Sequence, residues 1–203
     1  MRKRIWLIGL VIVLLVSGCG SAGSSNDLLK NVEKSDLALI DPVEPMVKEE
    51  TAIMDFSVSV LQNSMGEGEN ILLSPVSVIC ALAMTANGAA GETLEQMEEV
   101  LGLSVDELNN YLHYYMTYLP HHKDYKVNLA NAIWMKEKDG FTVSDKFLQR
   151  NLDYYDAGVY KAPFDNSTLK DINHWVKNNT DGMIEDQKTY LLRLQREKEE
   201  MMN

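Results

Sequence analysis

The chain has 203 residues, which is enough for one domain of ordinary size, and its 45% hydrophobic and 24% charged residues exclude disorder throughout. Its formal net charge of −11 argues against a nucleic-acid partner, because an excess of carboxylates repels phosphate backbones. Such an acidic chain is suited to remaining soluble outside the cell.

The first residues have the order of an export signal. Three basic residues at positions 2–4 precede an apolar run, 5–16, which is shorter than the roughly 20 residues that a membrane span needs. Val16-Ser17-Gly18-Cys19 resembles a bacterial lipobox, in which lipid is attached to the thiol before cleavage. We therefore expect a lipoprotein signal peptide at 1–18 and a lipidated Cys19, which anchors the protein on the extracytoplasmic face of a bacterial cell membrane. The alternative is an ordinary signal peptide that ends near a cysteine.

Removal of the signal peptide has two consequences for the mature chain. Three positive charges are lost, which leaves a formal charge of −14. Cys80 is then the one thiol without lipid, so no disulfide forms within one chain. Its apolar neighbours predict a small buried hydrophobic residue rather than a nucleophile.

Residues 19–48 are predicted to be the lipidated cysteine and a flexible tether. Glycine and serine dominate 20–25, and the acids and prolines that follow show little periodicity. Globular order is expected to begin near Glu49 with a first helix, and this helix is expected to end before Gly66 and Gly68. Its apolar stripe has helical spacing: Ile53, Phe56, Val60 and Leu61.

The stretch 70–103 predicts a strand and two helices in succession. Residues 71–73 form a short apolar strand, after which Ser74 caps a helix with Pro75 in its first turn. This helix is apolar nearly all round from Val76 to Ala86, which is typical of an element surrounded by protein.

Two further signals separate this helix from the next. Asn87-Gly88 supplies a residue that can take positive φ and end the first helix. Thr93 and Gln96 form a capping box for the second. One face of the second helix is apolar: Leu94, Met97, Val100 and Leu101.

Three blocks of this stretch resemble one family. Asn-Ile-Leu-Leu-Ser-Pro-Val-Ser at 70–77 is followed by Ala-Leu-Ala-Met at 81–84 and by Asn-Gly-Ala-Ala-Gly-Glu-Thr-Leu-Glu-Gln-Met at 87–97. This order resembles the amino-terminal signature of the serpins, protease inhibitors that trap their target through a large conformational change.

A third helix is predicted after Ser104 and Glu107, which form a second capping box. Its apolar and aromatic face continues to Pro120: Leu108, Tyr111, Leu112, Tyr115 and Leu119. His121 and His122 follow in a polar turn. Paired histidines can bind a metal, but neighbours in a loop point apart and no third ligand is evident, so we expect no metal site.

The second half of the chain predicts two strands and two helices. Period-two alternation from Lys126 to Met135 predicts a strand that is covered on both faces. Ser144 opens a helix, and 158–164 form a short strand closed by Pro163. The caps proposed for the last helix are Asp165 or Ser167 at its start and Gly182 at its end.

This half also resembles the serpins. The segment 127–149, with its Ala-Asn-Ala-Ile-Trp core, is similar to the serpin strand that runs down the central sheet. The segment 172–184 is similar to the serpin helix that lies across the front of that sheet. The resemblance therefore extends from Glu49 to about Asp186.

The resemblance implies an α+β fold. We expect the amino-terminal part of the serpin fold at 49–186, in which helices pack on an incomplete mixed or antiparallel central sheet, with the carboxyl-terminal half absent. The tail at 187–203 is not serpin-like. A frameshift or premature stop explains it, and a genuine short variant or an erroneous sequence record are the alternatives.

The resemblance also implies roles for two groups of residues. Four residues match the shutter region, below the place where the serpin sheet opens: Asn70, Ser74, Pro75 and Ser77. Three belong to the sheet-covering helix: Ile172, Trp175 and Val176. The shutter serines would find their partners in the missing half.

The expected function follows from the family. A full-length parent is expected to be a suicide inhibitor of serine or cysteine proteases, whereas this chain lacks the reactive-centre loop and is not expected to inhibit alone. The alternatives are a non-inhibitory binding or assembly fragment that complements a separate carboxyl-terminal half, or a pseudogene product. Enzymatic activity is not expected, because Ser74 lacks the glycine-flanked turn of a hydrolase nucleophile.

The expected partners are few. A target protease is expected for the full-length parent only, and the membrane is contacted through the lipid on Cys19. No cofactor, metal or nucleic acid is expected. The open edge of the sheet invites aggregation or pairing with another chain.

Overall fold

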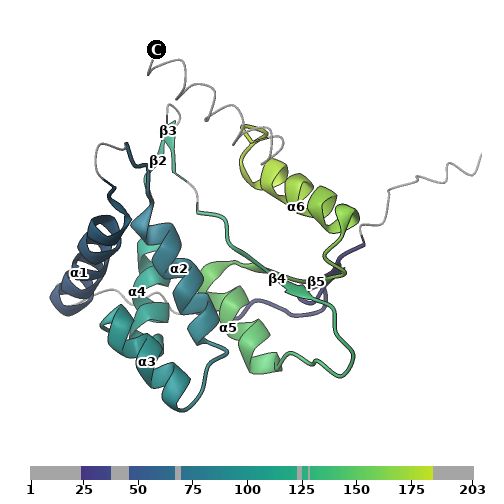
Figure 1. Ribbon diagram of the computed structural model, residues 1–203, viewed down its shortest axis with the longest axis horizontal. Helices are drawn as coiled ribbons and strands as arrows, with labels where there is room; N and C mark the ends of the chain where they lie inside the picture. The colour runs from purple at the N-terminus through teal and green to yellow at the C-terminus, as the bar shows by residue number, and fades with distance from the viewer. Residues whose placement is uncertain (1–23, 38–45, 67–69, 123–124, 128, 185–203) are drawn as a thin grey trace, which may run out of the picture.

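The computed structural model of the protein describes residues 24–37, 46–66, 70–122, 125–127 and 129–184. The helices are α1 (Val47–Ser64), α2 (Pro75–Ala86), α3 (Glu92–Leu101), α4 (Val105–Thr117), α5 (Asp145–Tyr155) and α6 (Asn166–Asn179). The strands are β1 (Asn26–Asp27), β2 (His121–His122), β3 (Tyr125–Lys126), β4 (Ala132–Lys136) and β5 (Gly158–Ala162). A cluster of helices, α1 to α5, lies on one side of a small sheet, and α6 lies on the other (Figure 1).

The sheet is mixed, which is one of the two arrangements expected from the sequence. Its strand order is β1-β5-β4. β4 runs parallel to β5, with Ala132 opposite Gly158 and Lys136 opposite Ala162, and α5 forms the crossover that a parallel pair requires. β1 pairs antiparallel with the other edge of β5. β2 and β3 form a separate antiparallel hairpin.

Helix α2 is at the centre of the helical core. Its inward residues Ile79, Cys80 and Ala83 have no exposed surface, and the small side chains allow α1, α3, α4 and α5 to approach it. A fully buried side chain of the size of Ile79 contributes roughly 1.5–3 kcal/mol to folding. Met84 of α2 is also buried, and the other buried members of the cluster come from the surrounding segments: Phe56, Leu101, Leu103, Leu108, Leu112, Tyr155 and Ala157.

Four predicted helix starts are confirmed. The side chain of Ser74 accepts a hydrogen bond from the Ser77 amide and caps α2, with Pro75 in the first turn. Ser104 and Glu107 form the expected capping box of α4. Ser144 caps α5 and Asp165 caps α6. These caps satisfy amides that have no partner within the helix.

The prediction for the end of α2 is wrong in its mechanism. The helix does end at Asn87, but this residue has a φ of −59°, and Gly88 is not among the glycines with positive φ. Gly88 is needed for space, because a Cβ there would lie 3.0 Å from the Phe147 ring. The predicted capping box of α3 is also wrong. Gly91, with a φ of 55°, precedes the helix, and Thr93 lies inside it.

The predicted strands are longer than the observed ones. Residues 71–73 form no strand, and Leu72 is 91% exposed. The strand predicted from Lys126 to Met135 is regular only from Ala132 onward. A strand requires a paired neighbour, and β5 begins at Gly158, directly opposite Ala132. The polar turn predicted at 121–122 is instead one strand of the β2–β3 hairpin.

Part of the predicted tether is structured. Residues 24–37, which we call the strap, contain β1 and lie along β5, α5 and α6. The remainder of the predicted tether, the signal peptide with Cys19 and the tail at 187–203 lie largely or wholly outside the described residues.

Candidate functional site

An aromatic stack lies on one face of the sheet, close to α6. Trp134 of β4 and Tyr160 of β5 are register partners and therefore lie on the same face. Their ring centroids are 4.3 Å apart, and the rings are nearly parallel, at 22°. The side chain of Trp175 on α6 lies close enough to the Tyr160 phenol to lower its pKa. Helix α6 lies over the face of β4 and β5 (Figure 1).

The position of the Tyr160 ring depends on Gly158. Side chains two residues apart on a strand share a face, and a Cβ at Gly158 would lie 2.6 Å from the Tyr160 ring. Burial raises the pKa of the Tyr160 phenol, and the nearby Asp27 carboxylate raises it further, against a smaller lowering effect of Trp175. The phenol therefore stays protonated at physiological pH.

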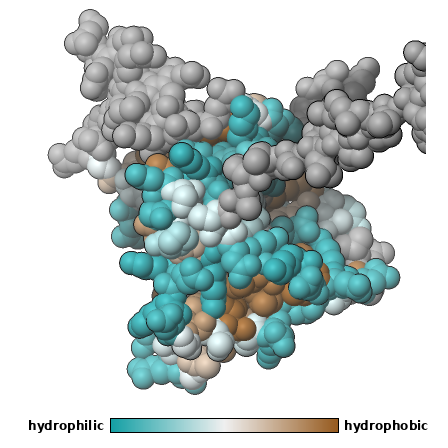
Figure 2. Space-filling view, turned by 90° about the vertical axis from the view of Figure 1, so that its right-hand side faces the viewer, coloured by the Kyte–Doolittle hydropathy of each residue, from teal (hydrophilic) through white to brown (hydrophobic). Residues whose placement is uncertain are grey.

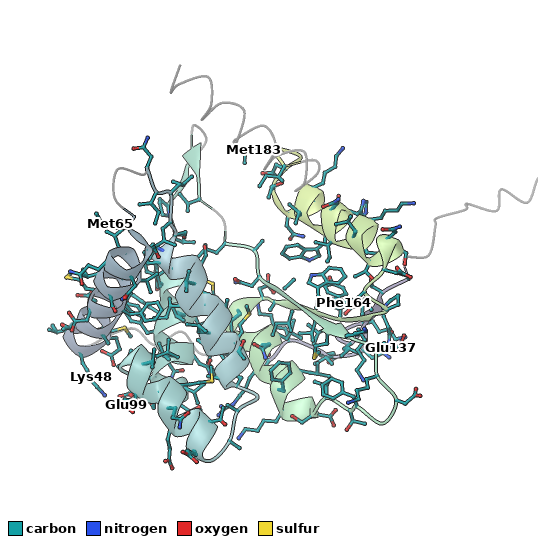
Figure 3. All side chains as sticks on the ribbon, viewed as in Figure 1. Lys48, Met65, Glu99, Glu137, Phe164 and Met183 are labelled. Carbon is teal, nitrogen blue, oxygen red and sulfur yellow. The ribbon has the colours of Figure 1, made fainter. Side chains whose placement is uncertain are left out.

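The turn into α6 has a strained backbone. Phe164 has a φ of 62°, which non-glycine residues rarely adopt, and its side chain is 51% exposed (labelled in Figure 3). Thr168, which is buried, accepts hydrogen bonds from the Phe164 amide at 2.9 Å and from the Asp165 amide at 3.3 Å. The capping box of α6 thus also secures this turn.

The predicted sheet-covering residues lie on the inner side of α6. Val176 is buried, and Ile172 and Trp175 are half-buried. Leu169 is 47% exposed, although the sequence pattern places it on the same apolar face.

The predicted shutter residues are only partly brought together. The hydroxyl oxygens of Ser74 and Ser77 are 2.8 Å apart, and both side chains are exposed. Asn70 is also exposed, and no hydrogen bond joins it to either serine in the part of the chain that the structure describes. Ser74 caps α2 by accepting a hydrogen bond from the Ser77 amide, and Pro75 is the first residue of the helix.

The strap is attached to α6 through one carboxylate. Asp171 Oδ2 accepts hydrogen bonds from Ser25 Oγ at 2.6 Å, the Ser25 amide at 3.0 Å and Ser24 Oγ at 3.2 Å. Burial disfavours the charged form of Asp171, but the hydrogen bonds from the two serines outweigh it and hold the pKa of this carboxyl below its ordinary value. The Leu28 amide then donates to the Val159 carbonyl at 2.9 Å, which extends the pairing with β5.

The other end of the strap is attached to α5. The Ser35 amide donates to Asp153 Oδ1 at 2.8 Å, and Gln149 Nε2 donates to the Glu33 carbonyl at 2.9 Å. Lys34 and Asp156 form an exposed ion pair at 3.0 Å, which contributes little. The strap therefore joins α6, β5 and α5.

Sequence reasoning missed both the strap and Tyr160. The apolar residues Leu28, Leu29 and Val32, which follow the glycine- and serine-rich stretch 20–25, were the available signal for the strap. For Tyr160, the signal was a glycine two positions before an aromatic residue in a predicted strand. Neither signal identifies the partner residues, which are more than a hundred positions away for Ser25.

Other chemistry is limited in the described residues. Cys80 is fully buried as predicted, and burial raises the pKa of its thiol to about 12, so it is not a nucleophile at neutral pH. No group of three or more metal-ligating side chains occurs within the described ranges. No helix among these residues is both long and apolar enough to cross a membrane.

Comparison with known proteins places this arrangement in one family. The family description "Serpin (serine protease inhibitor)" matches residues 51–191. Neuroserpin of Gallus gallus is 36% identical over 146 residues, which are 66% of this chain and 34% of neuroserpin. Among the curated relatives, this chain spans between about a third and a half of their length.

Solved structures agree with this match. The native state of the thermophilic serpin tengpin is 44% identical, with a TM-score of 0.72, and the match covers 80% of this chain and 42% of tengpin. A loop C-sheet serpin polymer is 45% identical, with a TM-score of 0.67, over 76% of this chain and 41% of that one. The six helices and the small mixed sheet thus form part of an α+β serpin fold, and the chain belongs to the serpin family.

Proposed function

We propose that this chain is the amino-terminal part of a lipid-anchored serpin outside a bacterial cell, whose complete form traps serine or cysteine proteases. The observation that carries the proposal is the position of α6 across the face of the parallel β4–β5 pair, with Trp175 of α6 close to Tyr160 of β5. In a serpin, the cleaved reactive loop inserts as a new strand of this sheet, so the contact between helix and sheet must yield during inhibition.

Four residues are proposed to belong to the sheet-opening region: Asn70, Ser74, Pro75 and Ser77. The two serines already lie within hydrogen-bond distance of one another, and they are exposed. Exposed hydroxyls at this place are available to groups from further strands. We propose that these groups come from sequence beyond the present chain, together with the reactive loop, and that this chain alone does not inhibit.

The test compares two products of the same gene. The purified 203-residue chain and a longer product that includes the downstream coding sequence are each incubated with a panel of serine and cysteine proteases. We expect a complex that survives denaturing electrophoresis from the longer product only. A denaturant-stable complex with the 203-residue chain would contradict the proposal. Failure of every longer reading frame to form one would assign the chain to a non-inhibitory role.

A second candidate function is assembly through the edge of β4. In the described part of the chain, β4 is the last strand of the sheet, and one similar structure is a serpin polymer. Asn131 accepts from the Gly158 amide, and the Glu137 amide donates to Ala162, so the odd-numbered residues bond to β5. The amide of Ala132 therefore faces away from β5, toward the open edge.

This geometry permits a selective test of assembly. Ala132→Pro removes an amide on the outer side of β4 and leaves the bonds to β5 intact, as proline does at sheet edges. If the chain complements a separately expressed carboxyl-terminal half, light scattering of the mixture shows a heterodimer, and Ala132→Pro weakens it at least tenfold. Equal assembly by the variant would exclude the β4 edge as the contact.

A further inference from the structure

The strap limits how far the folded domain can lie from the lipid anchor. Ser24 and Ser25 are held on α6 by Asp171, and Ser167 Oγ donates to Ser24 Oγ at 2.6 Å. Only four residues lie between Cys19 and Ser24, so five Cα–Cα steps join the two. An extended chain spans at most about 3.6 Å per residue, so the first turn of α6 lies within about 18 Å of Cys19. A flexible tether of the predicted length would impose no such limit.

The charges of the helices differ between the two ends of the molecule. Helix α6 carries the exposed residues Lys170, His174 and Lys177; its acids are Asp171, which is bonded to the strap, Asp165 at its N-cap and Asp181 just beyond its end. Helix α3 carries four carboxylates and no basic residue: Glu92, Glu95, Glu98 and Glu99. In Figure 1, α3 and α1 lie at the opposite end of the molecule from α6. An anionic membrane surface would repel α3 and attract the lysines of α6.

We propose that the outward face of α6 docks on the lipid surface, with α3 directed away from it. This inference rests on the proposed lipidation of Cys19 and goes beyond it, because lipidation alone sets no orientation. The short reach from Ser24 brings the first turn of α6 to the membrane, and the distribution of charge selects the side of the molecule that faces it. The occupant of this surface is thus an anionic lipid bilayer.

The test measures energy transfer from the protein to the membrane. The full lipidated chain is reconstituted in vesicles of phosphatidylcholine and phosphatidylglycerol that contain an acceptor-labelled lipid. A donor dye is attached to a cysteine introduced as Asn178→Cys on α6 or, as the matched control, Glu95→Cys on α3. Both positions are exposed, and labelling is brief and at neutral pH, where the buried Cys80 thiol, with its raised pKa, reacts more slowly than the introduced cysteines.

We expect markedly stronger transfer from position 178 than from position 95. A long glycine-serine insertion before Ser24 should reduce the difference, and Asp171→Asn, which weakens the attachment of the strap, should act in the same direction. Equal transfer from the two positions, or stronger transfer from 95, would overturn the orientation.

Mass spectrometry of the same samples separates the two proposals. Lipid on Cys19 together with equal transfer refutes the docking and leaves the anchor in place. If mass spectrometry finds no lipid on Cys19, and Cys19→Ser leaves membrane association unchanged, both the lipid anchor and the docking of α6 are refuted.

Discussion

Tyr160 illustrates how one side chain depends on the absence of another. Its ring stacks on Trp134, lies close to Trp175 of α6 and passes over Gly158. The ring can hold this position only because residue 158 has no Cβ. Residue 158 must therefore be glycine because a Cβ would collide with the Tyr160 ring, and not because the backbone needs a conformation that only glycine adopts.

Gly158→Ala is expected to destabilise the protein by about 1–3 kcal/mol, because the new Cβ forces Tyr160 off its position. Urea unfolding followed by circular dichroism measures the loss. The control is a double-mutant cycle with Tyr160→Leu, because the smaller leucine side chain leaves room for the methyl group of alanine at position 158. The double variant should lose less than the sum of the single ones. Strict additivity would show that the Tyr160 ring is not what the methyl group meets.

Glu107 is expected to make stability depend on pH. Its hydrogen bonds with Lys48 and then with Ser104 lower the pKa of the carboxyl from 4.5 to about 2. A lowered pKa in the folded state stabilises the protein above the unfolded value, and this contribution is lost as the pH falls from about 4.5 to 2. Both partners are more than a third exposed, so solvent screening limits the effect to roughly 1 kcal/mol or less.

The variant Glu107→Gln isolates this charge, because glutamine still fits a capping box. The difference in unfolding free energy between wild type and variant should be constant above about pH 5 and shrink below pH 4.5. High salt should reduce it at every pH. A difference that grows on acidification would contradict the assignment.

At the scale of elements, the strap acts as an additional edge strand. It covers the edge of β5 opposite to β4 and connects α5 with α6. Covering an edge in this way protects a sheet from pairing with other chains. The strap contacts α5 and α6 mostly through polar groups, so its attachment depends on a few hydrogen bonds.

Asp171→Asn is expected to weaken this attachment by roughly 1.5–3 kcal/mol, since hydrogen bonds to a charged acceptor are being replaced. Hydrogen exchange should show faster exchange of the Leu28 amide, which bonds to Val159, with little change in α2. Asp36→Asn, on the exposed part of the same strap, is the matched control. Unchanged protection of Leu28 in Asp171→Asn would show that β1 is held without α6.

The elements also show where prediction from sequence succeeds. Ser74, Ser104 and Ser144 mark helix starts correctly, because a cap depends on residues three positions away. The start of β4 is misjudged, because its length is set by β5, more than twenty residues further along the chain. Thr93 has the residue spacing of a cap, yet the positive φ of Gly91 starts α3 earlier.

On the scale of the whole molecule, burial is uneven. The helical core around α2 is closely packed, whereas Leu72 and Met183 are largely exposed, and Figure 2 shows an apolar area on the side of the molecule that it displays. The described sheet consists of one two-residue strand and two five-residue strands. The entropy of ordering the chain is therefore offset mainly by the helices.

We expect the 203-residue chain to be marginally stable, with a broad thermal transition by circular dichroism and binding of a hydrophobic dye. Cys80 provides a second readout, since its buried thiol, with a pKa of about 12, reacts with iodoacetamide only when the helical core opens. Alkylation at mildly alkaline pH should proceed measurably without denaturant. A sharp transition together with full protection of Cys80 would contradict the expectation.

The sequence by itself determined the family, the order of the helices and most of their starts, because these depend on residues close together in the chain, such as Ser74 with Pro75 or Asp165 with Thr168. Tertiary structure alone decided the strand lengths, the stack of Trp134 on Tyr160 and the attachment of the strap to Asp171. These features join residues that are tens to more than a hundred positions apart, and no local pattern specifies which pairs will meet.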